Sequence, residues 1–344
     1  MTQTTPHQPD AAEQQAREQA ITNEVVASFA TSTSERYREV MTSLVRHLHG
    51  FAREVRLTHA EWEIAIDFLT RTGQECNSHR QEFILLSDVL GLSMLTVGIK
   101  ASASDGATES TVFEPFFLDD APEIPLGGDL AQGAKDTPCW VSGQVRSTDG
   151  NPWAGVRIDA WEAGRGRQTT GPNGEYRFWS VLPTAYPIPD DGPVGELITA
   201  AGRRPMRPAH PHFKVTAPGH RTLITHVFVA DDEYLDPDAV FGVEDSLIAD
   251  FTKHTGGNAP DGTTRDGRST ATAAQPRRQQ PDPWRRARHG VELDQVAMAG
   301  PIPARSRLKQ RALTVTHGRR VSASSVAWPS VLIVCLRPGG TQLE

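Results

Sequence analysis

The spacing of apolar residues changes once along this chain, and the change limits the folds available to it. Between residues 22 and 100, apolar side chains recur at helical intervals. From residue 138 to about residue 251, short alternating runs are separated by glycine and proline turns. Helices followed by many short strands predict an all-β sandwich domain preceded by an α-helical domain.

Three stretches carry the helical signal. One apolar stripe consists of Tyr37, Val40, Met41, Leu44, Val45 and Leu48. Thr58 and Glu61 have the spacing of a capping box, ahead of the apolar positions of a second helix. A third helix is expected over residues 82–90, ending near Gly91. We therefore predict a disordered leader over residues 1–20 and a helical domain over residues 21–100, which forms a bundle or an oligomer interface.

The alternating runs that follow are short, as in a β-sandwich. They cover residues 140–145, 156–161, 176–179, 213–215 and 223–229. Turn signals separate them, including Asp149-Gly150 and Pro218-Gly219. We assign residues 101–137 to a connector and residues 138–260 to the sandwich.

The end of the chain has a different composition. Residues 261–344 hold 13 Arg and one Lys against six acidic residues, a net charge of +8, which leaves −15 for residues 1–260. We predict a disordered or aberrant basic tail of low order. Three interpretations stay open: a nucleic-acid-binding tail, a disordered extension, or a run translated in the wrong frame. The first is disfavoured because aromatic residues are not interleaved with the basic ones.

Composition also excludes several classes of protein. An acidic body does not favour nucleic acid or anionic membranes as partners. No apolar stretch is long enough for a membrane span, and the first twenty residues resemble no signal or transit peptide, so a cytoplasmic protein is expected. Cys76, Cys139 and Cys335 form no CxxC pair, which argues against a disulfide framework or a thiolate zinc site.

The sharpest local chemical signal is Arg207-Pro-Ala-His210-Pro-His212. Residues i and i+2 of a strand point to the same face, so His210 and His212 can offer two imidazole nitrogens to one metal ion. The same spacing also occurs by chance on protein surfaces. Tyr186, one of only four tyrosines, lies 24 residues upstream of His210 in a proline-rich turn, where a packing role is favoured for this residue taken by itself.

Beyond these residues, the chain resembles the intradiol ring-cleavage dioxygenases, and within them the hydroxyquinol 1,2-dioxygenase group. The resemblance rests on the helical region and on the strings PCWVSGQV, GEYRFWSVLPTAYPIPDDGPVG, RPAHPHFKVTAPGHRTLITHVFV and DEYLDPDAVFGV. It implies a sandwich catalytic domain with a non-haem Fe(III) ion, and a helical domain that forms a homodimer and can enclose a phospholipid. The implied substrates are a small aromatic diol or triol and O2, with hydroxyquinol cleaved to 3-hydroxy-cis,cis-muconate, the enol form of maleylacetate.

The resemblance also implies roles for particular residues. Tyr186, His210 and His212 match iron ligands, and Tyr186 matches the tyrosine that leaves iron and accepts a substrate proton. Arg207 matches a guanidinium that stabilises negative charge on the ring. Asp88 matches a position that can bond the third hydroxyl of hydroxyquinol. The positions that match the substrate pocket are Leu85, Asp88, Val112, Phe113, Pro115, Phe116, Ile188, Pro189 and Val240.

The chain departs from the family pattern in three places. Relatives carry a second tyrosine ligand on a loop after the Trp-Glu-Ala strand, but here Ala163 runs directly into Gly164. Tyr176 is expected to be a packing residue and no substitute. Glu114 stands where a glycine is usual in the pocket wall, and the basic tail follows where the last strand is expected. We expect weak iron binding, and turnover that is slow or absent.

Two alternatives to this assignment remain at the level of sequence. Catechol 1,2-dioxygenase is the nearest alternative activity within the same family. A non-catalytic, prealbumin-like binding module would share the glycine-rich hairpins but would not require the His-x-His motif.

Overall fold

The computed structural model describes residues 10–101, 107–112, 120–132, 134, 136–162, 164–254, 262, 270–276, 332–334 and 337–338. The chain forms two compact units, Met1–Gln74 and Glu75–Glu344. The helical domain was predicted to extend to residue 100, so this boundary is earlier than expected. Helical periodicity shows which face of a helix is apolar, but it does not show what that face packs against.

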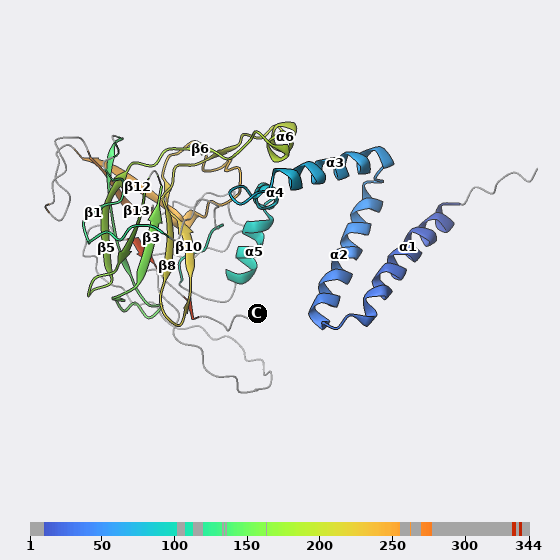
Figure 1. The fold of residues 1–344 in the computed structure, drawn as a ribbon, viewed down its shortest axis with the longest axis horizontal. Coiled ribbons are helices and arrows are strands. Elements are labelled where there is room, and N and C mark those ends of the chain that lie inside the picture. Colours follow the sequence, from blue (N-terminus) through green and yellow to red (C-terminus); the bar gives the residue numbers. More distant parts are fainter. Residues whose placement is uncertain are drawn as a thin grey trace, which may run out of the picture. The chain divides into compact units, whose positions relative to one another are not determined.

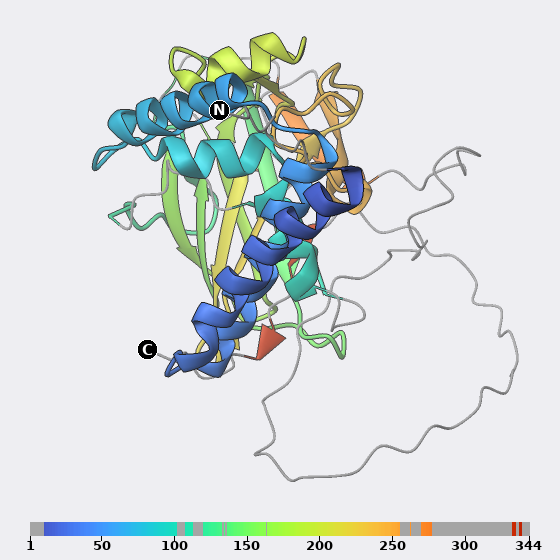
Figure 2. The same ribbon diagram turned by 90° about the vertical axis from the view of Figure 1, so that its right-hand side faces the viewer.

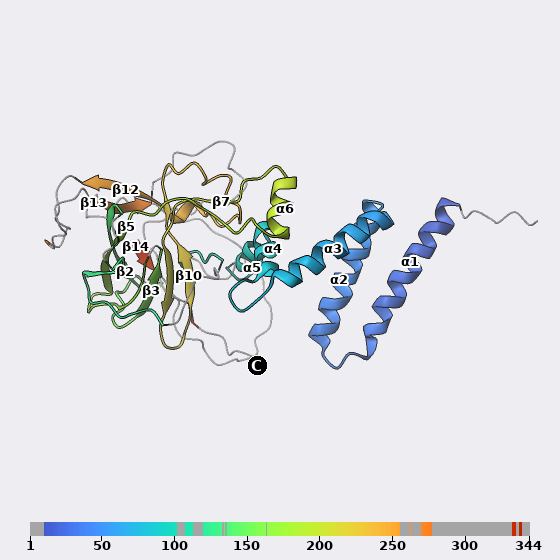
Figure 3. The same ribbon diagram turned by 45° about the horizontal axis from the view of Figure 1, so that its top comes forward.

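The first unit is built from helices that follow one another along the chain. α1 and α2 run antiparallel and side by side (Figures 1 and 3). The elements are α1 (Ala11–Ser28), η1 (Phe29–Thr31), α2 (Glu35–Glu54) and α3 (His59–Glu75).

The start of α1 corrects the prediction of a disordered leader over residues 1–20, since residues 11–20 are helical. The Asp10 side chain caps the helix by accepting a hydrogen bond from the Glu13 backbone N–H, at 2.8 Å. Arg17 pairs with Glu13 one turn away, at 3.0 Å. The stretch is rich in Ala, Glu and Gln, so helix propensity supports it although it lacks an apolar stripe.

Two predictions for α2 and α3 can be followed directly. The capping box is confirmed: the Thr58 backbone N–H donates to Glu61 Oε2 at 2.8 Å, and the Glu61 N–H donates to Thr58 Oγ1 at 3.3 Å. These bonds also lower the pKa of the Glu61 carboxyl. The apolar stripe of α2 is helical as predicted, but it is largely exposed, with Leu44 53% and Leu48 57% accessible.

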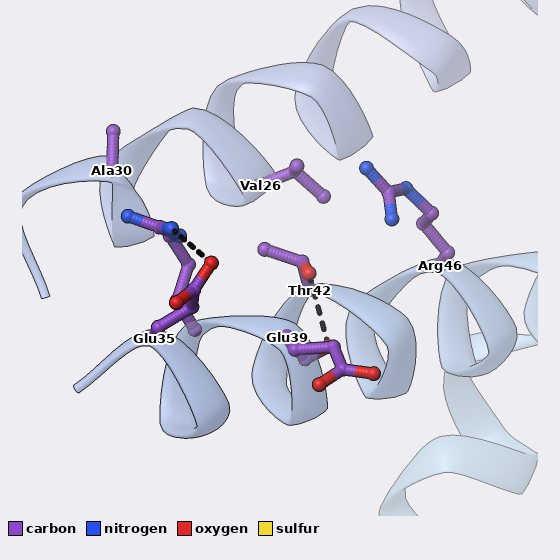
Figure 4. A pocket seen from close by; sticks show the side chains of 7 residues that line it. Val26, Ala30, Glu35, Glu39, Thr42 and Arg46 are labelled. Carbon is purple, nitrogen blue, oxygen red and sulfur yellow. Dashed lines mark hydrogen bonds and ion pairs between the residues drawn. The ribbon is translucent and has the colours of Figure 1, made fainter. Parts of the chain in front are cut away.

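A groove lies between α1 and α2 within the first unit (Figure 4). Its lining is mostly polar, and Glu35 and Arg38 form a pair there at 3.8 Å. The lining residues are Val26, Ala30, Glu35, Arg38, Glu39, Thr42 and Arg46.

The second unit contains two principal sheets. Among the described residues, one sheet has the order β1-β5-β2-β13-β12-β11 with β14 also paired to β2, and the other has the order β10-β8-β3-β4. The strands of the second sheet run side by side (Figure 2). The bounds of the first sheet are β1 (Gly128–Asp129), β5 (Glu175–Val181), β2 (Pro138–Val145), β13 (Thr270–Pro276), β12 (Ile248–His254), β11 (Phe228–Val229) and β14 (Leu332–Val334). Those of the second are β10 (Leu223–His226), β8 (His212–Thr216), β3 (Arg157–Trp161) and β4 (Arg165–Thr169).

The core lies between these sheets, as predicted for a sandwich. Ile158 of β3, Phe178 of β5 and Phe213 of β8 are among its buried members. Because strand side chains alternate, Phe213 and Val215 enter the core while His212 points to the opposite face. That opposite face carries the candidate site.

Three helices of the second unit build a smaller apolar cluster. They are α4 (Glu82–Val89), α5 (Leu92–Ala101) and α6 (Pro193–Ala200). Val89 of α4 packs with Val194 and Ile198 of α6. Gly91 allows the sharp change of direction between α4 and α5 because its φ is 72°. No single helix among the described residues is long and apolar enough to cross a membrane; α4 and α5 reach that length only together, with a 75° bend between them.

The predicted low-order tail supplies three short strands among its described residues. β13 pairs antiparallel with β12 and parallel with β2. The basic tail was expected in place of a last strand, but this part of the tail forms a strand of the sheet. β15 (Arg337–Pro338) pairs with β9 (His220–Arg221). The rest of residues 261–344 lies outside the described residues, apart from Gly262, and its low order stays a prediction.

Candidate metal and substrate site

A row of three side chains crosses the outer face of the four-stranded sheet. His212 of β8 is the direct partner of His226 on β10 and of Trp161 on β3. Directly opposite residues share a face, so the two imidazoles meet with their ring centroids 4.5 Å apart. The indole of Trp161 stacks on His212 at 4.9 Å and 5°. Strand register therefore fixes His212 between an aromatic plane and a second imidazole.

His210 completes a cluster of three imidazoles. It lies two residues before β8 begins, and its ring centroid is 4.7 Å from that of His212 and 4.6 Å from that of His226. One ligand atom from each histidine lies within 4.8 Å of the others. The Pro208 carbonyl lies 2.6 Å from His210 Nδ1, which assigns the N–H to Nδ1 and the lone pair to Nε2.

Tyr186 reaches the cluster through a short strand pair. In β6 (Tyr186–Pro187) and β7 (Met206–Arg207), Tyr186 is the direct partner of Arg207. The Tyr186 hydroxyl lies 3.3 Å from His210 Nε2, and Arg207 Nη1 lies 3.2 Å from the same atom. The prediction that Tyr186, His210 and His212 converge therefore agrees with this geometry. His210 Nε2 is the atom on which the hydroxyl and the guanidinium meet.

Arg207 is held by a buried carboxylate. Its Nε donates to Asp238 Oδ1 at 3.1 Å, and the two side chains are 0% and 2% exposed. Asp238 also accepts a hydrogen bond from the Gly242 backbone N–H at 2.7 Å. A Cβ on Gly242 would lie 2.9 Å from Arg207 Nη2, so glycine is required for this close approach.

Burial controls the electrostatics of the cluster. It lowers the pKa values of His210, His212 and His226 well below the ordinary range, and the positive charge of Arg207 lowers them further. Burial likewise raises the pKa of Tyr186, with smaller contributions from the carboxylates of Asp238 and Glu162. Without a metal, the cluster therefore consists of neutral imidazoles and a neutral phenol. Imidazole nitrogens, and the phenolate oxygen of a tyrosine that has lost its proton, are donors that bind iron and other first-row ions.

His226 is the least satisfied member of the cluster. Its side chain is fully buried, and neither ring nitrogen has a hydrogen-bond partner in the described part of the chain. An imidazole always carries at least one N–H, and an unpaired buried donor costs about 1–3 kcal/mol. A buried imidazole whose nitrogens lack hydrogen-bond partners is suited to bind a further group, such as a metal ion.

Asp88 on α4 lies within electrostatic range of Arg207. It is 6% exposed, and burial raises the pKa of its carboxyl, while a hydrogen bond from Ser93 and the charge of Arg207 act in the opposite direction. The helix therefore brings one carboxylate toward the guanidinium of Arg207.

Most of the predicted pocket residues that are described gather in the apolar cluster of α4 and α6. Ile188 and Val240 are buried there. Leu85 and Val112 belong to the same cluster. Pro189, by contrast, follows Ile188 in the chain, is exposed to solvent and does not belong to this apolar cluster. The predictions for Phe113, Glu114, Pro115 and Phe116 lie outside the described residues.

The place of the missing second tyrosine is a tight hairpin beside the cluster. Trp161 and Arg165 are direct partners in β3 and β4, and the Glu162 N–H donates to the Gly164 carbonyl at 2.9 Å. Trp161 is the residue that stacks on His212, so a longer loop here would start next to the histidines. Tyr176 is buried in the sandwich core, as expected for a packing residue.

Sequence reasoning missed two residues of this site. His226 was assigned only to a strand, and its place in the cluster depends on the pairing of β10 with β8. Asp238 was quoted within a family string but given no role, although it is the buried partner of Arg207. A histidine within an otherwise largely apolar strand is the one local signal that could have found His226.

Comparisons with known proteins show the family to which the chain belongs. A family model described as "Catechol dioxygenase N terminus" matches residues 34–108, and one described as "Dioxygenase" matches residues 163–265. Hydroxyquinol 1,2-dioxygenase of Nocardioides simplex is 49% identical over 302 residues, covering 83% of this chain and 98% of that protein. 6-Chlorohydroxyquinol 1,2-dioxygenase of Cupriavidus pinatubonensis is 52% identical over 254 residues, covering 69% and 92%.

Solved structures show the same relationship. Hydroxyquinol 1,2-dioxygenase from Pseudomonas putida DLL-E4 superimposes with a TM-score of 0.71 at 42% identity, covering 75% of this chain and 96% of that one. Catechol 1,2-dioxygenase from Pseudomonas arvilla C-1 gives a TM-score of 0.63 at 25% identity, covering 75% and 89%. The chain therefore belongs to the intradiol ring-cleavage dioxygenases, the family of the hydroxyquinol and catechol 1,2-dioxygenases.

Proposed function

We propose that this protein cleaves hydroxyquinol between its two adjacent hydroxylated carbons, using O2 and non-haem iron. The product is 3-hydroxy-cis,cis-muconate, the enol form of maleylacetate, and both atoms of O2 enter it. The supporting observation is the meeting of the Tyr186 hydroxyl and the Arg207 guanidinium at His210 Nε2, within 3.3 Å, beside two further histidines.

The residues present fit an iron site. Tyr186, His210 and His212 would hold Fe(III). The ring nitrogens of His226 have no hydrogen-bond partner among the described residues, so the cluster offers one further nitrogen donor. Bound iron would withdraw electron density from a chelated substrate, which makes the aromatic ring reactive toward O2. The fit is incomplete in one respect, because Tyr186 is the single tyrosine among the described residues of the cluster.

Tyr186 and Arg207 have distinct tasks in this proposal. Tyr186 would give up its proton when it holds the ion. Because burial raises the pKa of Tyr186, the phenolate oxygen formed in this way would be a strong base and could accept the proton of a substrate hydroxyl. Arg207 carries a planar guanidinium that is held in place by Asp238. Its guanidinium stabilises negative charge that develops on the ring without exchanging a proton.

Substrate selection is assigned to the α4 side of the site. Asp88 would accept a hydrogen bond from the third hydroxyl of hydroxyquinol, a group that catechol lacks. Leu85, Ile188 and Val240 would contact the ring and exclude water.

A homodimer through the helices of the first unit is part of the proposal. Tyr37, Leu44 and Leu48 expose apolar surface on α2, and Trp62 and Ile66 do so on α3. Exposed apolar patches of this kind favour burial against a second copy or a phospholipid chain. Size-exclusion chromatography with light scattering tests the dimer, and lipid extraction followed by mass spectrometry tests the phospholipid.

The activity is tested on the full chain loaded with iron under argon and then mixed with hydroxyquinol and 18O2. The expected product carries two labelled oxygen atoms in mass spectrometry. A Tyr186→Phe variant should lose turnover, and Tyr234→Phe serves as the matched control outside the cluster. Absence of ring-opened product from an iron-loaded, folded chain would reject the proposal.

A further inference from the structure

We propose that His226 is a metal ligand, so that His210, His212, His226 and Tyr186 hold the metal ion of this site with three imidazoles and one phenolate. The inference concerns the same site as the proposed function and rests on that function only in placing a metal there. It assigns His226 a role that the sequence motif does not contain.

The first observation is the strand register, which pairs His226 with His212. His226 is the last residue of β10 and the direct antiparallel partner of His212, the first residue of β8. The two side chains must therefore leave the sheet on the same face and at the same level. A residue in this position cannot turn away from the site without breaking the pairing of the two strands.

Burial and hydrogen bonding carry the second step. His226 is 0% exposed, and both its ring nitrogens lack a hydrogen-bond partner among the described residues. By contrast, both ring nitrogens of His210 have close neighbours: Nδ1 is bonded to the Pro208 carbonyl, and Nε2 lies near the Tyr186 hydroxyl and Arg207. A bound ion would satisfy one nitrogen of His226 and explain why a polar ring is fully buried on this face of the sheet.

Distances carry the third step. Ligand atoms from the three histidines lie within 4.8 Å of one another. Nitrogens bound to one ion at about 2.0–2.1 Å lie no more than about 4.2 Å apart, so small side-chain rotations close the cluster. The Tyr186 hydroxyl is already 3.3 Å from His210 Nε2 and would supply a fourth donor.

The number of donors is the fourth step. With His226, the metal ion would have three imidazoles and one phenolate as protein ligands, where the sequence motif alone supplies two imidazoles and one phenolate. Imidazole nitrogens suit Zn(II), Co(II) and Fe(II). The short connection between β3 and β4 brings no tyrosine to the cluster, so His226 occupies the coordination capacity that one phenolate leaves open.

The test uses the full-length, metal-free chain with Zn(II) and Co(II) as probes. X-ray absorption of the Zn(II)-loaded protein should count three imidazoles per ion, and His226→Gln should reduce the count to two. Co(II) titration followed by its visible absorption should show an affinity loss of at least about 10- to 100-fold in His226→Gln. His220→Gln is the matched control, because His220 lies on β9 against Trp153 and outside the cluster.

The outcomes separate this inference from the proposed function. Two imidazoles in the unmodified chain would overturn the inference, and so would unchanged Co(II) affinity in folded His226→Gln. The imidazole count on the unmodified chain decides the matter even if the variant does not fold. A chain that binds Zn(II) through three imidazoles but never cleaves hydroxyquinol would retain the inference and reject the function.

Discussion

Arg207 and Asp238 form an ion pair that is almost completely removed from solvent. Arg207 Nε lies 3.1 Å from Asp238 Oδ1, and Nη2 lies 3.5 Å from Oδ2. The remaining terminal nitrogen, Nη1, lies 3.2 Å from His210 Nε2. Asp238 therefore orients the guanidinium toward the cluster while neutralising its charge.

Asp238→Asn should destabilise the protein by about 3–5 kcal/mol, because it leaves the Arg207 charge buried without a counterion. Chemical denaturation of the metal-free chain measures the change. Asp191→Asn is the control, since Asp191 pairs with Arg80 but is 76% exposed, so this variant should lose far less stability than Asp238→Asn. Equal losses in both variants would contradict the role of the buried pair.

Asp88→Asn should alter the choice between substrates. The amide accepts a hydrogen bond from the third hydroxyl more weakly than the carboxylate does, so kcat/KM for hydroxyquinol should fall by about 10- to 100-fold. The value for catechol should change little, because catechol has no hydroxyl at that position. Steady-state O2 uptake with both substrates provides the comparison, and a parallel fall for both would remove Asp88 from substrate selection.

Stability of the metal-free protein should decline as pH falls from about 7 to 5. The pKa values of His210, His212 and His226 are lowered in the folded state. Below about pH 6.5, therefore, these histidines are protonated in the unfolded chain but remain neutral in the folded chain. As the pH falls through this window, each histidine should lower the free energy of unfolding by up to about 1.4 kcal/mol per pH unit. Above the window, the histidines cause no such loss of stability.

Urea unfolding at several pH values, with a chelator present, measures this slope. His226→Asn lacks one of the three groups and should show a shallower slope by about one proton. A slope that is unchanged in this variant would mean that His226 is not a neutral buried imidazole.

A longer loop that carries tyrosine, inserted between Ala163 and Gly164 together with Glu114→Gly, should raise Fe(III) affinity by at least about 10- to 100-fold. The insertion point follows Trp161, which stacks on His212, so the new phenolate starts beside the cluster. Absorption by the iron-loaded protein should show a stronger tyrosinate-to-iron band. The same loop with phenylalanine is the control, and equal affinity for both loops would contradict the prediction.

The local signals in the sequence determined those features that depend on residues near one another in the chain. Thr58 and Glu61 cap α3 because both partners lie within one helical turn. His210 and His212 share a site because they are two residues apart in an extended segment. Tyr186 and Arg207 followed from the family resemblance rather than from spacing.

The tertiary structure alone decided which distant residues meet. His226 joins His212 across 14 residues of chain through the register of β8 and β10, and Asp238 reaches Arg207 across 31. α4 belongs to the unit of the strands because Val89 packs against α6, which helical periodicity could not show. Periodicity determines the face on which a side chain lies, whereas strand pairing and packing between distant segments determine which side chain it meets there.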